Sequence, residues 1–291
     1  FFFLSGYLFF RSGTLSRGDY VRKMQARVRT LLIPFLFWNV VTFAAIYLAH
    51  SLPATAPYFV AGKAKLASLN LGDQLALILG FTRYPISYQF WFIRDLMVVA
   101  VATRLIYLAL RYAWFVVMPL LFALWLAGLQ LVPVISTDSI LFFSLGALLA
   151  LKGVSPFALD RFLLVLLAVW AVLAAVTVAF LGSPIEGLAR RFAILDGAAV
   201  ALALTGIVMG MPRLKLALLA LAPASFFVFA THEPTLTILK KLVYRVVPIT
   251  PATALAIYIL LPIVIIALTT VIYALASRAL PRATAFVTGG R

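Results

Sequence analysis

The sequence contains no cysteine, and only two of its 291 residues are histidine. Without a thiol, disulfide bonds, cysteine nucleophiles and thiolate-bound metals are excluded. The two histidines, His50 and His232, lie far apart, and two isolated imidazoles are too few to build a histidine zinc site. We therefore expect no bound metal ion and no bound cofactor.

Charged residues are scarce as well. They make up 11% of the chain, whereas 65% of the residues are hydrophobic; soluble domains carry about 25% charged residues. This composition excludes an intrinsically disordered chain and an ordinary soluble enzyme. The chain has 24 basic and 8 acidic residues, a net charge of +16. Because the cations lie in short segments between apolar runs, they indicate membrane topology rather than nucleic-acid binding.

Long apolar runs predict an all-α fold, a polytopic transmembrane helix bundle in which residues 1–291 form a single integral-membrane domain. A membrane span needs about 20 apolar residues. The sequence starts inside an apolar run, so we expect a first transmembrane helix upstream of residue 1 and ten spans in the complete protein. Eight full spans and one partial span are predicted here: Phe1–Phe10 (partial), Leu31–His50, Phe90–Leu110, Ala113–Val132, Ser139–Leu151, Phe162–Leu181, Phe192–Met211, Leu216–Ile238 and Ala252–Ser277.

The distribution of cations orients these spans. Residues 11–30 contain six cations and one acidic residue, which predicts a basic cytoplasmic loop by the positive-inside rule. Alternation of the spans then makes residues 51–87 an extracytoplasmic loop and leaves the C-terminus in the cytoplasm. The loop at 51–87 contains a short apolar piece, Leu75–Phe81, and a loop of this length usually packs against the bundle.

Two oppositely charged residues, Arg94 and Asp95, follow Trp91 at the outer end of a predicted span. Ionisable residues inside a bilayer are expensive and often functional. Adjacent residues on a helix point about 100° apart, so these two need not pair with each other. An alternative is an interfacial belt, in which Trp91 anchors at the headgroups and Arg94 reaches outward to water.

A second polar group, His232 and Glu233, lies near the outer end of another predicted span and precedes Pro234. Proline removes one helical hydrogen bond, which frees the carbonyl of residue 230 and bends the helix or opens a polar pocket. A neutral imidazole at His232 could act as a general base, or it could bond to a neighbouring helix. Asn39, in the middle of a span, predicts a hydrogen bond between helices.

Three segments resemble the acyltransferase-3 family of bacterial membrane O-acyltransferases. The first, Phe1–Phe9, is similar to the second span of that family. The second, Arg29–Trp38, continues from the basic segment. The third, Phe90–Leu96, is followed much later by Ser225–His232. Together they cover residues 1 to about 240.

The resemblance implies an acyl-CoA donor, usually acetyl-CoA, bound from the cytoplasm, and an acceptor hydroxyl on a sugar or cell-envelope glycan. It also implies a multi-pass protein of the bacterial inner membrane, with the catalytic histidine upstream of Phe1. The family often has Arg-x-x-Arg in the basic loop, where this chain has Arg27-x-Arg29. For the acceptor side, the candidates are His232, Glu233, Trp91, Arg94 and Asp95. For the acyl donor, they are Arg22, Lys23, Arg27 and Arg29, since cations bind the phosphates of CoA.

Two other function classes remain open from the sequence. A carrier or flippase for a lipid-linked sugar usually has two related halves with broken helices at matching positions, and no such repeat is present in the sequence. A structural membrane subunit has no need for His232 or for the Arg94-Asp95 pair of charges inside the membrane. The sequence therefore favours the O-acyltransferase, with the carrier as its alternative.

Overall fold

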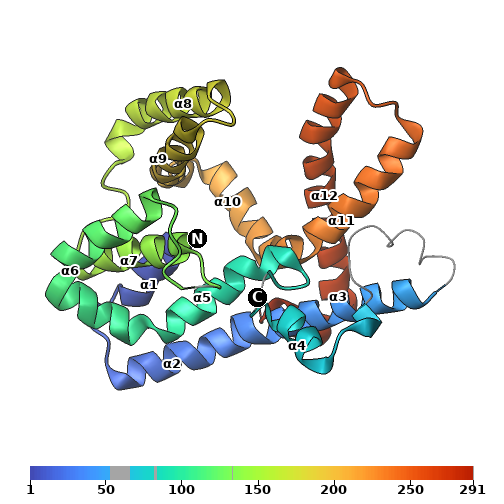
Figure 1. The fold of residues 1–291 in the computed structure, drawn as a ribbon, viewed down its shortest axis with the longest axis horizontal. Helices are drawn as coiled ribbons and strands as arrows, with labels where there is room; N and C mark the ends of the chain where they lie inside the picture. The colour runs from blue at the N-terminus through green and yellow to red at the C-terminus, as the bar shows by residue number, and fades with distance from the viewer. Residues whose placement is uncertain (53–65, 82–83, 133, 291) are drawn as a thin grey trace. The chain divides into compact units, whose positions relative to one another are not determined.

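The computed structural model describes residues 1–52, 66–81, 84–132 and 134–290 (Figure 1). In these residues every regular element is a helix, which confirms the all-α prediction for this part of the chain. Two compact units interleave along the sequence. The first unit comprises Phe1–Lys23 and Val98–Leu219, and the second unit comprises Met24–Met97 and Ala220–Arg291.

The first unit is built from three helix pairs: two are consecutive in the chain, and one joins the unit's two segments. In it, α1 packs on α7, α6 on α7, and α8 on α9. Its helices are α1 (Phe2–Phe10), α6 (Thr103–Leu126), α7 (Thr137–Leu151), α8 (Leu163–Ala179) and α9 (Pro184–Met209), with a short 3₁₀ turn η5 (Asp160–Phe162); α2 (Arg17–Arg27), α5 (Trp91–Val101) and α10 (Pro212–Leu221) each continue from one unit into the other.

The second unit places α11 against α12, and α3 against α4 and α13. In Figure 1 α11 and α12 form the orange-to-red hairpin, and α3 is the blue helix that continues from α2. Its elements are η1 (Val28–Leu32), α3 (Ile33–Ser51), η3 (Leu66–Ser68), α4 (Leu71–Leu79), η4 (Tyr88–Phe90), η6 (Ala222–Ala224), α11 (Ser225–Val246), α12 (Pro251–Ala279) and α13 (Pro281–Thr288).

Several helices are long and apolar enough to cross a membrane. Among the described residues six helices meet both criteria, and α7 is a shorter apolar helix. A multi-pass membrane protein is therefore supported, while the count of eight full spans is not reached. The six are Arg17–Ser51, Thr103–Leu126, Asp160–Ala179, Pro184–Met209, Pro212–Val246 and Pro251–Ala279.

The predicted span Phe90–Leu110 is divided in the structure. It comprises α5 and the first part of α6, separated at Ala102. The φ and ψ of Ala113, −134° and 26°, then interrupt the helical geometry of α6. This break falls between the predicted spans Phe90–Leu110 and Ala113–Val132, but the single membrane-length helix Thr103–Leu126 covers parts of both, so two separate spans are not confirmed here.

The prediction of a basic loop at residues 11–30 is wrong in its secondary structure. Helix α2 and the π-helical turn η1 run directly into α3. Between Asp19 and Ile33 the chain has no glycine or proline and is rich in arginine, lysine, methionine and glutamine, which are good helix formers. Cations and apolar residues therefore share one continuous helical segment.

The segment 51–87 contains helix α4 (Leu71–Leu79), which overlaps the apolar piece Leu75–Phe81. Helix α4 begins at an Asn70 cap, whose side chain accepts from the Asp73 amide at 2.8 Å. It ends at Gly80, where φ is +72° and the left-handed conformation favours glycine. Residues 53–65 and 82–83, which belong to the predicted extracytoplasmic loop, lie outside the described residues.

Helix α13 fastens the C-terminal part of the second unit to α3. The indole of Trp38 donates to the carbonyl of Val287 at 3.0 Å, and the rings of Phe37 and Phe286 lie 5.9 Å apart. Next to α13, Gly289 has a φ of +75°, and a Cβ there would lie 2.7 Å from the carbonyl oxygen of Thr30. Only glycine fits this approach of the chain end to the π-helical turn.

Helices α1 and α7 cross with their backbones in direct contact. A Cβ on Gly6 would lie 2.0 Å from the carbonyl oxygen of Phe143, and a Cβ on Gly146 would lie 1.9 Å from that of Phe3. Each helix thus offers a glycine to the backbone of the other. Small residues permit such approaches between membrane helices, where van der Waals contact replaces the hydrophobic effect as the driving force.

We expect Gly6→Ala and Gly146→Ala each to destabilise the protein by several kcal/mol, because the added methyl overlaps backbone that cannot yield to it. Thermal unfolding of the purified protein in detergent measures the loss. The control is Gly18→Ala in helix α2, where the nearest atom to the new methyl is 3.9 Å away. That change should be neutral or slightly stabilising; equal effects at all three glycines would contradict the close crossing.

Candidate functional site

The predicted acceptor-side residues lie in the second unit, at the start of α5 and on α11. The chain reaches α5 through Ser87 and the 3₁₀ turn Tyr88–Phe90, which contacts α11. A turn of this kind leaves several backbone and side-chain polar groups without the partners that an α-helix supplies. We call Ser87–Phe90 the entry turn, and its polar ties define the site.

Arg94 and Asp95 form a buried ion pair. The Arg94 guanidinium donates to Asp95 Oδ1 from Nη2 at 2.7 Å and from Nε at 3.0 Å, and the side chains are 7% and 0% exposed. Arg94 Nη1 also donates to the carbonyl of Gly80 at 2.7 Å, which joins α5 to the end of α4. The interfacial interpretation of Arg94 is therefore wrong. Although neighbouring side chains diverge, the long arginine side chain bends back to its neighbour, which neutralises both charges.

Gln89 ties the entry turn to α11 at the position that Pro234 leaves open. Its Nε2 donates to the carbonyl of Ala230 at 3.1 Å, and Gln89 and Ala230 are 7% and 1% exposed. Residue 230 is the one whose helical hydrogen bond a proline at 234 removes. The sequence predicted this free carbonyl, and the structure supplies the group that binds it.

Asn39 ties the entry turn to α3. This fully buried side chain accepts from the backbone amide of Ser87 at 3.1 Å and donates to the carbonyl of Phe35 at 2.8 Å. The hydroxyl of Ser87 donates to that of Thr42 at 2.7 Å. Asn39 does link separate segments, as predicted, but its partner is the entry turn rather than another long helix.

An aromatic cluster surrounds Phe90, which is fully buried. Its ring lies 5.3 Å from that of Phe229, 6.1 Å from Phe35 and 6.3 Å from Phe226. Rings from α3, η4 and α11 therefore enclose the last residue of the entry turn, and pairs at these distances stabilise one another by about 0.5–1.5 kcal/mol. The polar ties sit beside a water-free core.

His232 is half-buried on α11 and turns one ring nitrogen to its own helix. Nδ1 lies 2.7 Å from the carbonyl of Phe229, and the two rings are 5.9 Å apart. A carbonyl only accepts, so Nδ1 is the donor of this bond, and in the neutral form of the imidazole Nε2 then keeps its lone pair. Among the hydrogen bonds of the described residues, none joins His232 to a neighbouring helix, so the bracing interpretation finds no support.

Glu233 accepts a hydrogen bond from the hydroxyl of Thr237 at 2.9 Å. The negative charge of Glu233 also acts on Tyr88 in the entry turn. The pKa of the Tyr88 phenol is raised, mainly by loss of hydration and to a smaller extent by the charge of Glu233. The phenol therefore stays protonated and available as a donor near neutral pH. Trp91, half-buried at the start of α5, follows directly in the chain.

The predicted donor-side cations differ in their surroundings. Arg22, in the first unit, is bonded to Asp19 at 2.6 Å. Lys23 donates to the carbonyl of Phe9, and its ammonium lies 4.7 Å from the ring of that residue. In the second unit Arg27 is half-buried at the end of α2, whereas Arg29 is exposed on the π-helical turn η1. Arg22 and Arg29 are thus the two exposed cations of the four, and Arg22 is already paired with Asp19.

The sequence did not identify Gln89, Tyr88 or Ser87 as site residues. The available signal was the free carbonyl at residue 230, which required a donor from elsewhere in the chain. Within the described ranges no three histidine, aspartate or glutamate side chains come together.

The fold and site define a multi-pass membrane protein with a polar centre where α5 and α11 meet. The model of the acyltransferase domain, the acyltransferase-3 family, matches residues 1–274, and the chain therefore belongs to that family. A curated relative is the succinoglycan biosynthesis protein ExoH of Rhizobium meliloti (strain 1021), 30% identical over 167 residues. The match covers 55% of this chain and 42% of that protein, so the chain spans less than half of the relative's length. No solved structure matches this chain.

The Gln89–Ala230 hydrogen bond predicts that substitutions of Gln89 and Pro234 have coupled effects on the free energy of unfolding. Gln89→Leu leaves a buried carbonyl without a donor, which should lower the free energy of unfolding by about 1–3 kcal/mol. In a Pro234→Ala background, residue 234 regains an amide that can bind that carbonyl, so Gln89→Leu should cost less than about 1 kcal/mol.

Unfolding of the four variants in detergent gives the coupling energy as a double-mutant cycle. The control is Gln130→Leu, the same substitution at an exposed glutamine. If Gln89→Leu costs the same in both backgrounds, the bond to Ala230 does not stabilise the site.

Proposed function

We propose that the protein is a membrane O-acyltransferase that transfers an acyl group from a cytoplasmic acyl-CoA to a hydroxyl of a sugar or cell-envelope glycan. Membership of the acyltransferase-3 family supports the reaction class. The relative named for succinoglycan biosynthesis supports a polysaccharide acceptor. The proposal includes acetyl-CoA as the donor, a location in the bacterial inner membrane and a cytoplasmic C-terminus.

The hydrogen bond between His232 Nδ1 and the Phe229 carbonyl is the observation that supports His232 as an acceptor-binding residue. It orients the ring and leaves the Nε2 lone pair to accept a hydrogen bond from the acceptor hydroxyl. Glu233 follows His232 in the chain, its charge acts on Tyr88, and the two side chains offer an acceptor and a donor for further hydroxyls. The family resemblance assigns the catalytic histidine to a position ahead of Phe1, so His232 is proposed to position the acceptor.

In the reaction the acceptor oxygen forms a bond to the acyl carbon, the carbon–sulfur bond breaks, and CoA leaves as its thiol. The proton of the hydroxyl passes to a general base, which then delivers it to the leaving sulfur. At the donor side, the exposed Arg29, with Arg27 beside it, is proposed to hold the phosphates of CoA by charge-assisted hydrogen bonds. Arg22 and Lys23 are less suitable, because Asp19 and Phe9 already bind them.

The alternative function is a carrier or flippase for a lipid-linked sugar. The two proposals differ in one measurement: the transfer of radiolabel from acetyl-CoA to a glycan by the complete protein in membrane vesicles. An acyltransferase makes labelled glycan from the added donor, whereas a carrier moves the lipid-linked sugar without using acetyl-CoA. No label above that of vesicles without the protein would overturn the proposed function.

We expect His232→Gln to lower kcat for acyl transfer tenfold or more, about 1.4 kcal/mol in the barrier, without reducing the amount of folded protein. An amide can replace a bracing hydrogen bond but does not reproduce the imidazole lone pair at the same place. The control is His50→Gln, the same change at the other histidine of the chain. Full turnover by the His232 variant would leave this residue with a structural role only.

The double variant Arg27→Ala/Arg29→Ala should raise the KM for acyl-CoA about tenfold, because each charge-assisted hydrogen bond to a phosphate stabilises the complex by about 1.5–3 kcal/mol at most sites and less where water competes. The KM for the acceptor should stay the same. Added salt should raise the donor KM of the natural protein more than that of the variant, since salt screens the interaction that the variant lacks.

The matched control is Arg213→Ala/Lys215→Ala, which removes two cations from another segment predicted to face the cytoplasm. An unchanged donor KM in the Arg27/Arg29 variant would reduce that segment to a topology signal.

A further inference from the structure

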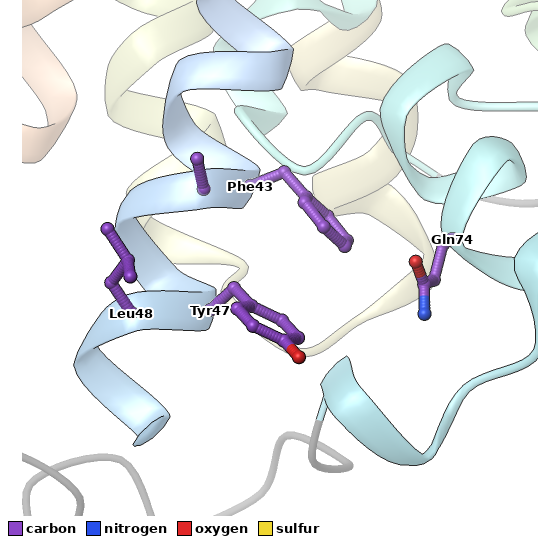
Figure 2. Close-up of a pocket in the computed structure, with 5 residues that line it drawn as sticks. Phe43, Tyr47, Leu48 and Gln74 are labelled. Atoms are coloured by element: carbon purple, nitrogen blue, oxygen red, sulfur yellow. The ribbon is translucent and has the colours of Figure 1, made fainter. Parts of the chain in front are cut away.

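The C-terminal half of α3 carries a pocket that none of the site residues above lines. Its volume is about 440 Å³, and it lies between α3 and the facing residue Gln74 of α4 (Figure 2). The other lining residues come from two successive turns of α3: Phe43, Ala44, Tyr47 and Leu48.

One wall of the pocket is aromatic. The rings of Phe43 and Tyr47 lie 6.2 Å apart and are inclined by only 20°, so they form a nearly flat, stacked pair. Figure 2 shows both side chains extending from α3 towards the side on which Gln74 lies. Tyr47 is 40% exposed, so this aromatic surface is open to a ligand.

The pocket also has polar groups at its edge. These are the phenol of Tyr47 and the amide of Gln74, whose Nε2 donates to the carbonyl of Leu69 at 2.9 Å. That bond fixes the orientation of the amide, and the amide oxygen can accept further hydrogen bonds. The pocket therefore combines a flat apolar face with a donor and an acceptor beside it.

The pocket continues the site along a single face of α3. Asn39, which binds the entry turn, is followed by Phe43 and Tyr47 at intervals of four residues. Residues at this spacing lie above one another on a helix. At a rise of 1.5 Å per residue, Tyr47 is about 12 Å along the axis from Asn39, so the pocket lies about that far along α3 from the residue that binds the entry turn.

We propose that this pocket binds a pyranose ring of the acceptor glycan, next to the ring that receives the acyl group; this inference rests on the proposed function. A pyranose has an apolar face of C–H groups, which packs on an aromatic face, and hydroxyls around its rim, which the Tyr47 phenol and the Gln74 amide can bind. Ligand pockets commonly measure about 300–1,000 Å³, so this one suits one or two sugar rings. A lipid chain would use the aromatic face but neither polar group.

The test uses the complete protein in nanodiscs with methyl β-D-glucopyranoside and methyl β-D-galactopyranoside as probes. Saturation-transfer NMR should detect binding of at least one of them to the natural protein. Tyr47→Leu should weaken that binding about tenfold, as expected from loss of an aromatic contact. Ala44→Phe, which fills the pocket without removing a wall, should also weaken it. Tyr258→Leu is the matched control, since Tyr258 is 80% exposed and does not line the pocket.

A second measurement separates this inference from the proposed function. In the acyl-transfer assay, Tyr47→Leu and Ala44→Phe should raise the KM for the glycan while kcat and the KM for acyl-CoA stay the same. If transfer proceeds and the acceptor KM is unchanged in both variants, the sugar pocket is refuted and the function stands. If the glycosides bind through Tyr47 but no acyl-CoA is used, the pocket stands and the function is refuted. Occupation by lipid, with no glycoside bound, also overturns the pocket.

Discussion

The requirement that backbone polar groups find partners away from water governs the second unit. In the hydrocarbon region every unsatisfied N–H or C=O costs several kcal/mol, so a non-helical segment persists only where side chains or other segments bind it. In the entry turn the backbone amide of Ser87 meets this requirement through Asn39. Gln89, within the turn, and Arg94, in α5, in turn satisfy the carbonyls of Ala230 and Gly80. These ties hold α3, α4, α5 and α11 around one polar centre.

The same requirement explains why a proline is tolerated in α11. Pro234 removes a donor from the helix, and Gln89 replaces it from 141 residues earlier in the chain. The replacement bond fixes the distance between the entry turn and the turn of α11 that carries His232. The carbonyl that Pro234 leaves free in α11 is thus the group to which the entry turn binds.

The sequence predicted the features that depend on local pattern. Apolar runs indicated most of the helices, and the rule for proline indicated the free carbonyl at residue 230. The partners could not be predicted, because the Gln89–Ala230 bond joins residues far apart in the chain and no local pattern selects Gln89 over other donors. The pairing of Arg94 with Asp95 depends on side-chain bending, which the helical direction of neighbouring residues does not reveal. The basic segment was taken for a loop because charge was given more weight than the absence of helix-breaking residues.

Helix α13 (Pro281–Thr288) lies beyond the family match but packs against residues within it. The family match ends at residue 274, yet Trp38 is bonded to Val287, and Gly289 lies against Thr30 in the turn that presents Arg29. Residues beyond the matched range therefore contact a segment within it. A shortened chain that ends at residue 274 would contain the whole matched range and still lack the contacts that join α13 to α3 and η1.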